Sequence, residues 1–381
     1  QPRSASGPAR LMAPVTYHRG GFPPPQLDWQ QLIPLLGPAN ASLARYDGLL
    51  EGIPNPAVLL SPLSSQEAVL SSRIEGTQAT LAEVLEFEAD AEASTLPQER
   101  RDDIREVQNY RHAMRQAVEL LDTLPLSLRV IKTLHATLLS GVRGDDKAPG
   151  EFRKIPNWIG PKYRPIEEAR FIPISADKLD AAMGSWESFI HDEYPDRLVQ
   201  LAIVHAEFES LHPFLDGNGR IGRMVLPLFL WQTGILRMPY FYLSAYFEAN
   251  KDSYVERLLA ISRDGDWTGW CRYFLEAVQA QASQNQERAS QILALYENLK
   301  PAVQEATHSQ YAVAALDWIF STPTFRATDF EKHAGIPVPT AKRILRCLEN
   351  AEILAVIREA SGRRPRVLCL EQLLAVAEGR P

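Results

Sequence analysis

Hydrophobic residues recur every three or four positions through most of the chain between residues 21 and 300. Leu32, Leu35 and Leu36 show this spacing, which places apolar side chains on one face of a helix. The pattern predicts a series of amphipathic helices, interrupted by an acidic, proline-containing loop over 86–99. Further helices are predicted over residues 102–121, 127–139, 198–212 and 221–234. The expected fold class is therefore mainly α-helical.

The segment from 141 to 175 has a different pattern, rich in glycine and proline. Residues 154–160 and 169–175 resemble two short strands around a polar tip. Their prolines suit an edge hairpin rather than a central strand. A hairpin with a free edge can accept a peptide as an added strand, and the alternative is a surface loop without a partner.

The pattern changes again near residue 305. A helix over 311–320, a short helix ended by Gly335 and a third helix containing Pro339 precede a strand–turn–strand pattern over 355–370. Helix, helix, helix and hairpin is the order of a winged helix-turn-helix domain. We therefore expect four parts, which are a flexible leader (1–20), an N-terminal helical module (21–100), a core (101–304) and a C-terminal domain (305–381).

Composition narrows the possible functions. The 381 residues carry a net charge of −7, which argues against capture of nucleic acid by overall charge. Cys271, Cys347 and Cys369 lack the spacing of metal ligands or of a disulfide framework, which favours a reducing, cytoplasmic location. The longest apolar stretches, such as 224–231, are too short to span a bilayer, so no membrane association is expected.

The segment 210–224, SLHPFLDGNGRIGRM, carries the strongest chemical signal. Glycines after a helix end let successive backbone N–H groups point into one concavity, which can bind an anion. Arg220 and Arg223 then fall in the first turn of the next helix, on one face. Cations are unfavourable at a helix start, so two arginines there indicate a polyanionic ligand such as a triphosphate.

Asp216 and His212 complete this set. A carboxylate inside a phosphate-binding turn would repel the ligand unless a hard cation joins them, and Mg²⁺ prefers one carboxylate plus phosphate oxygens. His212 is placed to accept a proton from an incoming hydroxyl. The alternative is a glycine-rich turn with an Arg–Asp ion pair, but the combination of features favours a nucleotide site. His205 lies two turns before His212, about 10 Å away, and is interpreted as a packed core residue rather than a second metal ligand.

The segment resembles the signature of the Fic family, His-x-Phe-x-Asp/Glu-Gly-Asn-Gly-Arg-x-x-Arg. Every specified position matches, namely His212, Phe214, Asp216, Gly217, Asn218, Gly219, Arg220 and Arg223. The resemblance implies a Fic-type helical bundle that transfers AMP from ATP to a hydroxyl side chain of a target protein. The related Doc toxin, a kinase, has Ala and Lys at the positions of Gly217 and Gly219, so this chain resembles the nucleotidyl-transferring members.

The resemblance also implies a role for each motif residue. His212 is the general base, Asp216 holds Mg²⁺, and Phe214 packs beneath the loop. The implied nucleotide-binding residues are Gly217, Asn218, Gly219, Arg220, Ile221, Gly222 and Arg223, with the two arginines on the β- and γ-phosphates.

A second segment, SSRIEGT (71–77), resembles the inhibitory helix of the family, expected here over 66–76. The matching residues are Ser71, Glu75 and Gly76. In such relatives the glutamate pairs with the second motif arginine and blocks productive ATP binding, so Glu75 would occupy Arg223. Taken alone, the pattern describes a helix that ends at Gly76. The wider stretch 66–85 resembles the N-terminal module of the bacterial subgroup that carries a C-terminal winged helix.

Two further features follow from the resemblance. The hairpin at 150–175 corresponds to the family's flap, on which a target protein docks as an added strand. The segment 241–254 corresponds to the base pocket, with Asn250 and Tyr254 as candidate nucleotide contacts, although aromatic residues at such spacing also occur in ordinary cores. A homodimer is the family-level expectation.

The main hypothesis is thus an autoinhibited protein adenylyltransferase that uses ATP and Mg²⁺. One alternative is a nucleotide-sensing DNA-binding regulator, for which the basic residues are Arg343, Arg346, Arg363, Arg364 and Arg366. The near balance of ten basic and nine acidic residues over 305–381 favours a protein contact instead. Another alternative is removal of AMP, or transfer of a different phosphate-containing group, at the same site.

Overall fold

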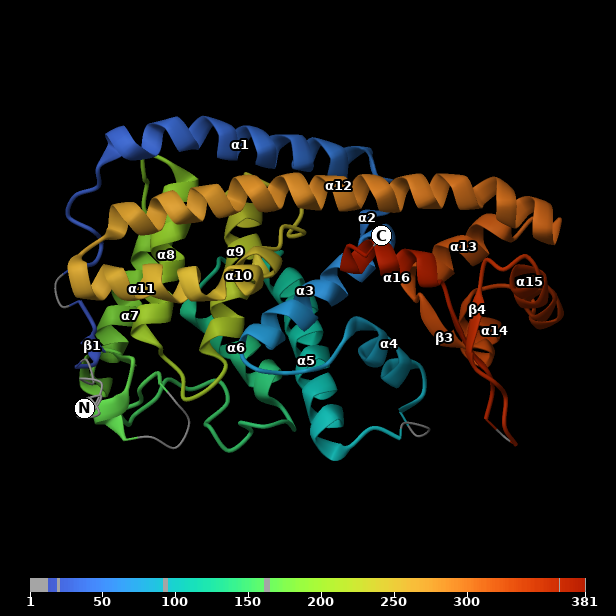
Figure 1. Cartoon of the computed structure of the whole chain (residues 1–381), viewed down its shortest axis with the longest axis horizontal. Helices are drawn as coiled ribbons and strands as arrows, with labels where there is room; N and C mark the ends of the chain where they lie inside the picture. The colour runs from blue at the N-terminus through green and yellow to red at the C-terminus, as the bar shows by residue number, and fades with distance from the viewer. Residues whose placement is uncertain (1–12, 19–20, 92–94, 161–164, 363, 381) are drawn as a thin grey trace, which may run out of the picture.

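The computed structural model describes residues 13–18, 21–91, 95–160, 165–362 and 364–380 of the chain. Helices dominate, which confirms the predicted fold class. Two long helices, α1 (Trp29–Gly52) and α12 (Trp267–Thr307), lie side by side along one face of the molecule (Figure 1). Asp28 caps the start of α1 by accepting a hydrogen bond from the backbone N–H of Gln30.

The remaining core helices pack beneath this pair. They are α3 (Ser61–Ile74), α5 (Gln98–Leu121), α6 (Leu128–Leu139), α7 (Ala176–His191), α8 (Arg197–Leu211), α9 (Asn218–Gln232), α10 (Ser244–Ala249) and α11 (Lys251–Asp264). Every residue of α9 from Asn218 to Leu230 is buried, as expected for a helix surrounded by others. Because α8 ends at Leu211 and α9 begins at Asn218, the turn over 212–217 joins two central helices.

Three helices connect α1 to α5. After α2 (Pro56–Leu59) and α3, helix α4 (Leu81–Ala89) begins with a capping box between Thr80 and Glu83. The loop predicted over 86–99 is therefore wrong at its start, since Glu86 and its neighbours extend α4 to Ala89. Glutamate and alanine have good helix propensity, which explains why this acidic stretch continues the helix.

The flap contains less regular structure than its sequence predicts. Strand β2 (Phe171–Ile172) pairs with Ile159 through a single antiparallel bridge, and a 3₁₀ turn over Ile166–Glu168 precedes it. Residues 161–164, at the predicted tip, lie outside the described residues.

The other edge of β2 is covered by the start of the chain. Strand β1 (Val15–Thr16) runs parallel to β2, and Tyr17 and His18 both bond to the buried carboxylate of Glu207 on α8. The prediction of an unstructured leader through residue 20 is therefore wrong for 13–18, while 1–12 and 19–20 lie outside the described residues. The leader orders because an unpaired strand edge and a buried carboxylate both gain partners from it.

The C-terminal part has the helix, helix, helix and hairpin order expected from the sequence, and two additional elements. Its elements are α13 (Ala312–Ser321), β3 (Thr324–Arg326), α14 (Ala327–His333), α15 (Val338–Asn350), β4 (Ala355–Arg358), β5 (Val367–Cys369) and α16 (Glu371–Glu378). The strands form an antiparallel sheet in the order β3-β5-β4. Helix α16 packs against α3, so this part touches the predicted inhibitory helix (Figure 1). Within the described ranges, no helix combines the length and apolar character needed to cross a bilayer.

Candidate active site

The motif histidine lies at the C-terminal cap of α8, in an unusual backbone conformation. His212 has a φ of 46°, in the left-handed region that non-glycine residues rarely adopt. Arg153, from the flap segment, donates from Nε to the carbonyl of His212 at 2.9 Å and from Nη2 to that of Leu211 at 3.2 Å. Its own N–H bonds to the carbonyl of Pro213. A buried guanidinium therefore satisfies the end of α8 and holds the histidine in place.

Phe214 and His135 form the floor of the turn. The two rings stack with centroids 3.7 Å apart, and both side chains are fully buried, which agrees with the packing role implied for Phe214. His135 accepts a hydrogen bond at Nδ1 from the N–H of Gly150 and donates from Nε2 to the carbonyl of Asp216. Burial lowers the pKa of His135 to about 4, so this neutral tautomer persists at physiological pH.

Asn218 braces the same turn from within. Its amide nitrogen donates to the carbonyl of Phe214 at 2.9 Å, and its amide oxygen accepts from the N–H of Phe214 at 2.8 Å. The side chain is buried and occupied, so a phosphate contact from this residue would have to use its backbone N–H. That N–H belongs to the first turn of α9, where intrahelical acceptors are lacking.

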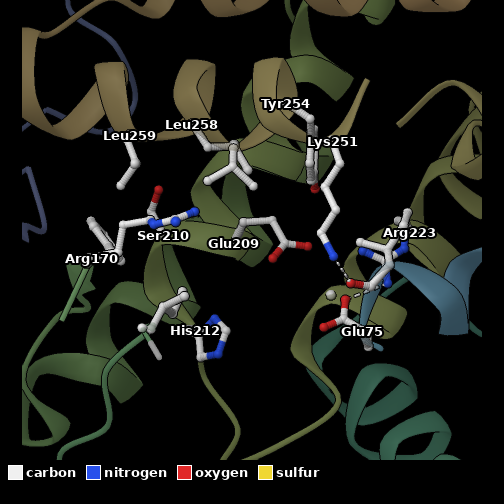
Figure 2. Close-up of a pocket in the computed structure, with 16 residues that line it drawn as sticks. Glu75, Arg170, Glu209, Ser210, His212, Arg223, Lys251, Tyr254, Leu258 and Leu259 are labelled. Atoms are coloured by element: carbon white, nitrogen blue, oxygen red, sulfur yellow. Dashed lines mark hydrogen bonds and ion pairs between the residues drawn. The ribbon is translucent and has the colours of Figure 1, made fainter. Parts of the chain in front are cut away.

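Arg223 is held by the predicted inhibitory helix. Its Nε donates to Ser71 Oγ at 2.8 Å, and Nη2 donates to the Ser71 carbonyl at 2.8 Å. Nη2 also donates to Glu75 Oε1 at 2.6 Å, and Figure 2 shows these two side chains facing each other. Burial would raise the pKa of Glu75, but the charge and hydrogen bond of Arg223, together with the charges of Arg220 and His212, lower it overall. The structure thus brings Ser71, Glu75 and Arg223 together as the resemblance implies.

Glu75 also lies directly over the start of α9. A Cβ placed on Gly219 would overlap Glu75 Oε1, so only glycine at this position leaves room for the carboxylate. Gly217, with a φ of 77°, forms the N-cap of the same helix. A helix N-terminus attracts anions, and here the anion is a carboxylate of the protein itself.

Arg220 points away from this contact. Its Nη1 donates to Glu106 Oε2 at 2.9 Å, and its Nη2 lies 3.4 Å from Asp216 Oδ1. The second oxygen of Glu106 pairs with Arg143 at 3.0 Å. The described residues that line the cavity do not include Arg220, which in this state is a buried partner of two carboxylates.

Asp216 fits the role of a metal-binding carboxylate. Its Oδ1 accepts from the N–H of Gly217 at 2.6 Å and its side chain is 37% exposed, beside the start of α9. A Cβ on Gly144 would come within 3.1 Å of Asp216 Oδ2. The absence of a side chain at Gly144 therefore leaves space beside that oxygen. One accessible carboxylate next to the N-terminus of α9 matches what Mg²⁺ requires when phosphate oxygens supply further ligands.

A cavity of about 500 Å³ is lined by Glu75, His212, Gly219 and Arg223, whereas Asp216 is not among the described residues that line it. Its charged end contains Glu75, Arg223 and Lys251, and Glu209 and His212 lie nearer the middle (Figure 2). Its other, more apolar end is lined by Ile159, Phe171, Val255, Leu258 and Leu259, with Arg170 beside Leu259 (Figure 2). Burial lowers the pKa of His212 to about 4, although the charge of Glu75 opposes this shift, so the imidazole is neutral and able to accept a proton.

The two candidates for the base pocket differ in position. Tyr254 lines the cavity, and its hydroxyl donates to His205 Nε2 at 2.9 Å. Asn250 is exposed, donates to the carbonyl of Tyr246, and is not among the described residues that line the cavity. His205 is fully buried and donates from Nδ1 to the carbonyl of Gly222, so the interpretation of it as a core residue is confirmed.

The residues between the two arginines support the helix. The side chain of Ile221 is in the core and its N–H bonds to the carbonyl of Gly217, which leaves it no group for a nucleotide. Gly222 packs against Glu209, since a Cβ there would overlap Glu209 Oε1.

Five residues of the site were not predicted from the sequence. These are Glu106, His135, Arg153, Glu209 and Lys251. Lys251 Nζ donates to the carbonyl of Ile74 at 2.6 Å and so holds the end of α3 from α11. Glu106 and His135 come from helices outside the predicted motifs, whereas Arg153 lies within the predicted flap. None of the five shows a spacing pattern that would single it out.

Comparison with known proteins identifies the family. The family described as "Fic/DOC family N-terminal" matches residues 33–119, and the "Fic/DOC family" matches residues 125–230. Proteins called "Protein adenylyltransferase Fic" from Drosophila willistoni and Drosophila melanogaster are each 24% identical over 213 residues. The match covers 54% of this chain but 38% and 39% of those relatives, so the chain spans less than two-fifths of their length.

Solved structures share the fold. A Fic family protein from Desulfovibrio desulfuricans G20 superposes with a TM-score of 0.57 at 19% identity, over 92% of this chain and 98% of that one. A Fic domain containing signaling protein from Bacteroides thetaiotaomicron VPI-5482 gives a TM-score of 0.55 at 17% identity, over 67% and 96% of the two chains. At these identities the likeness concerns the fold alone.

Proposed function

The chain belongs to the Fic/DOC family, and from this premise we propose that it is a protein adenylyltransferase held inactive by Glu75. The names of its relatives support ATP as the nucleotide and a protein as the acceptor. The position of Glu75 carries the proposal, because its carboxylate bonds to Arg223 while lying over Gly219 at the start of α9. A carboxylate there occupies the place of a phosphate.

The reaction follows from the groups around the cavity. A hydroxyl oxygen of the target attacks the α-phosphorus of ATP, the bond to the bridging oxygen of the β-phosphate breaks, and pyrophosphate leaves. The hydroxyl proton passes to the neutral imidazole of His212. The N–H groups of the first turn of α9 and the guanidinium of Arg223, once released from Glu75, stabilise the charge on the phosphates. Mg²⁺ bound to Asp216 would supply further charge neutralisation.

The flap suggests where the target docks. One edge of β2 is already paired with β1, so the free edge of the flap is the segment 155–160. Ile155 and Trp158 are 57% and 42% exposed there, which is unusual for large apolar side chains. An extended target segment added along this edge would bring a Ser, Thr or Tyr hydroxyl towards His212.

The decisive experiment measures transfer of label from α-labelled ATP to the protein itself and to lysate proteins. We expect Glu75→Ala to raise labelling at least tenfold, and His212→Ala to abolish it in that background. Glu51→Ala is the matched control, since Glu51 also pairs with an arginine, Arg237, and neither is among the described residues that line the cavity. Unchanged labelling in Glu75→Ala, with ATP binding intact, would reject the inhibitory role.

The mass gained by a labelled target separates this proposal from other phosphate-group transfers. A gain of one adenylyl group supports it. Loss of that mass from an already modified protein would instead identify the reverse reaction.

A further inference from the structure

Glu209 is a partly buried acid that lines the cavity and that the proposed reaction does not use. It precedes His212 by three residues on α8, and its Oε1 is buried without a hydrogen-bond partner among the described residues. Burial raises the pKa of this carboxyl to about 7, against the opposing influence of Arg223. A buried polar atom without a partner costs free energy unless a ligand supplies the missing hydrogen bond.

The structure reserves space for this carboxyl. Gly222, in the middle of the first two turns of α9, packs against it, and a Cβ on Gly222 would overlap Glu209 Oε1. Gly222 has helical backbone geometry, so the helix itself does not require glycine there. The absence of a side chain at Gly222 therefore leaves room for the carboxyl of Glu209.

The carboxyl lies between the two ends of the cavity. Figure 2 shows it between Leu258 and Leu259 on one side and Arg223 with Glu75 on the other. In the proposed function the phosphates occupy the charged end, and the apolar end suits the flat face of a base. The sugar of the nucleotide then spans the middle of the cavity, beside Glu209.

We propose that Glu209 is a specificity-determining residue, which accepts a hydrogen bond from a ribose hydroxyl and so selects ribonucleotides over deoxyribonucleotides. This inference rests on the proposed function. A carboxyl oxygen that is desolvated in the free protein loses little further hydration on binding, so a hydroxyl gives it a partner at low cost. A nucleotide without that hydroxyl would leave the oxygen unpaired.

The test uses isothermal titration calorimetry with ATP, 2′-deoxy-ATP and 3′-deoxy-ATP, each with Mg²⁺, in the Glu75→Ala protein. We expect ATP to bind about tenfold more tightly than at least one deoxy analogue. Glu209→Ala in the same background should bind ATP and that analogue with equal Kd. Gly222→Ala should weaken the discrimination as well, because the new methyl group displaces the carboxyl while keeping its charge.

The possible outcomes separate the two proposals. Tight ATP binding without discrimination in the Glu75→Ala protein, or discrimination that persists in Glu209→Ala, overturns the role of Glu209 and leaves the adenylyltransferase proposal standing. Failure of ATP to bind at all overturns both. Circular dichroism unfolding of each variant checks that a lost preference does not come from a lost fold.

Discussion

The guanidinium of Arg153 donates a hydrogen bond of 2.9 Å to the backbone carbonyl of His212, 59 residues further along the chain. The same side chain bonds to the carbonyls of Leu211 and Ile174. Arg153 therefore connects the flap segment, the end of α8 and the proposed general base through one buried group. The backbone of His212 depends on this contact because its left-handed conformation is otherwise unfavourable.

Replacement of Arg153 by methionine should lower the rate of AMP transfer at least tenfold in the Glu75→Ala background, with the Kd for ATP changed less than twofold. The reason is that the imidazole loses its fixed position while the phosphate-binding groups remain. Single-turnover labelling and calorimetry measure the two quantities. Arg257→Met, at a half-exposed ion pair with Asp266, is the control. Equal loss of rate in both variants would contradict a positioning role for Arg153.

The overlap between Gly219 and Glu75 predicts a non-additive pair of substitutions. Gly219→Ala should lower the free energy of unfolding by about 1–2 kcal/mol, because the new Cβ displaces Glu75 and comes within 2.9 Å of Arg223 Nη1. In the Glu75→Ala background the same change should be neutral or stabilising, since alanine has the better helix propensity. Urea unfolding of the four proteins measures the coupling.

Gly184 in α7 is the control for helix propensity, because nothing lies within 4 Å of a Cβ placed there. Gly184→Ala should stabilise the protein by up to about 1 kcal/mol in either background. Additive effects of Gly219→Ala and Glu75→Ala would show that the carboxylate does not lie over α9 in solution.

His135 predicts a pH dependence of stability. Its pKa is lowered in the folded protein from 6.5 to about 4, so its contribution is complete above pH 6.5 and is lost as the pH falls towards 4. His135→Gln should therefore destabilise the protein at pH 7. It should also reduce the change in the free energy of unfolding between pH 7 and pH 4 by up to about 3 kcal/mol. Urea unfolding at several pH values tests this.

The comparison between variant and wild type is essential for that measurement. The pKa of Glu67 and that of Glu209 are each raised to about 7 by burial, so their contributions are lost as the pH rises from 4.5 through 7. These opposing contributions cancel when the free energy of unfolding of the variant is subtracted from that of the wild type at each pH. Parallel curves for wild type and variant would mean that His135 is not buried in its neutral form.

The C-terminal part should bind duplex DNA weakly, because most of its basic side chains already have partners. Arg343 donates to the carbonyl of Thr307, Lys342 pairs with Glu331, and Arg366 pairs with Glu349. Fluorescence anisotropy with the full-length protein and a labelled duplex at low salt measures the affinity. Submicromolar binding that weakens steeply with added salt would favour the DNA-binding alternative.

The sequence alone was sufficient to predict the motif turn. Glycines, an asparagine and two arginines at fixed spacing between two helices are local signals, and they led to His212, Asp216 and Arg223. The ion pair between Glu75 and Arg223 joins distant segments, and its prediction relied on the family resemblance rather than on periodicity.

The supporting residues could not be predicted in this way. Glu106 and His135 sit inside ordinary amphipathic helices, and Arg153 lies in an irregular segment, so their roles depend on contacts made only after the chain folds. Strand β1 contains two residues and gains its structure from β2, which no local pattern encodes. Asn218 illustrates a further limit, because its side chain braces the turn where the resemblance suggested a phosphate contact.

The pairing of β1 with β2 has a practical consequence for anyone preparing this protein. Cleavage after residue 18 would remove Tyr17 and His18 from Glu207 and expose the backbone of Phe171 and Ile172. A second strand could then dock on the wrong side of the flap, including one from another copy of the chain. Differences in N-terminal trimming between preparations would thus appear as differences in target preference and in aggregation.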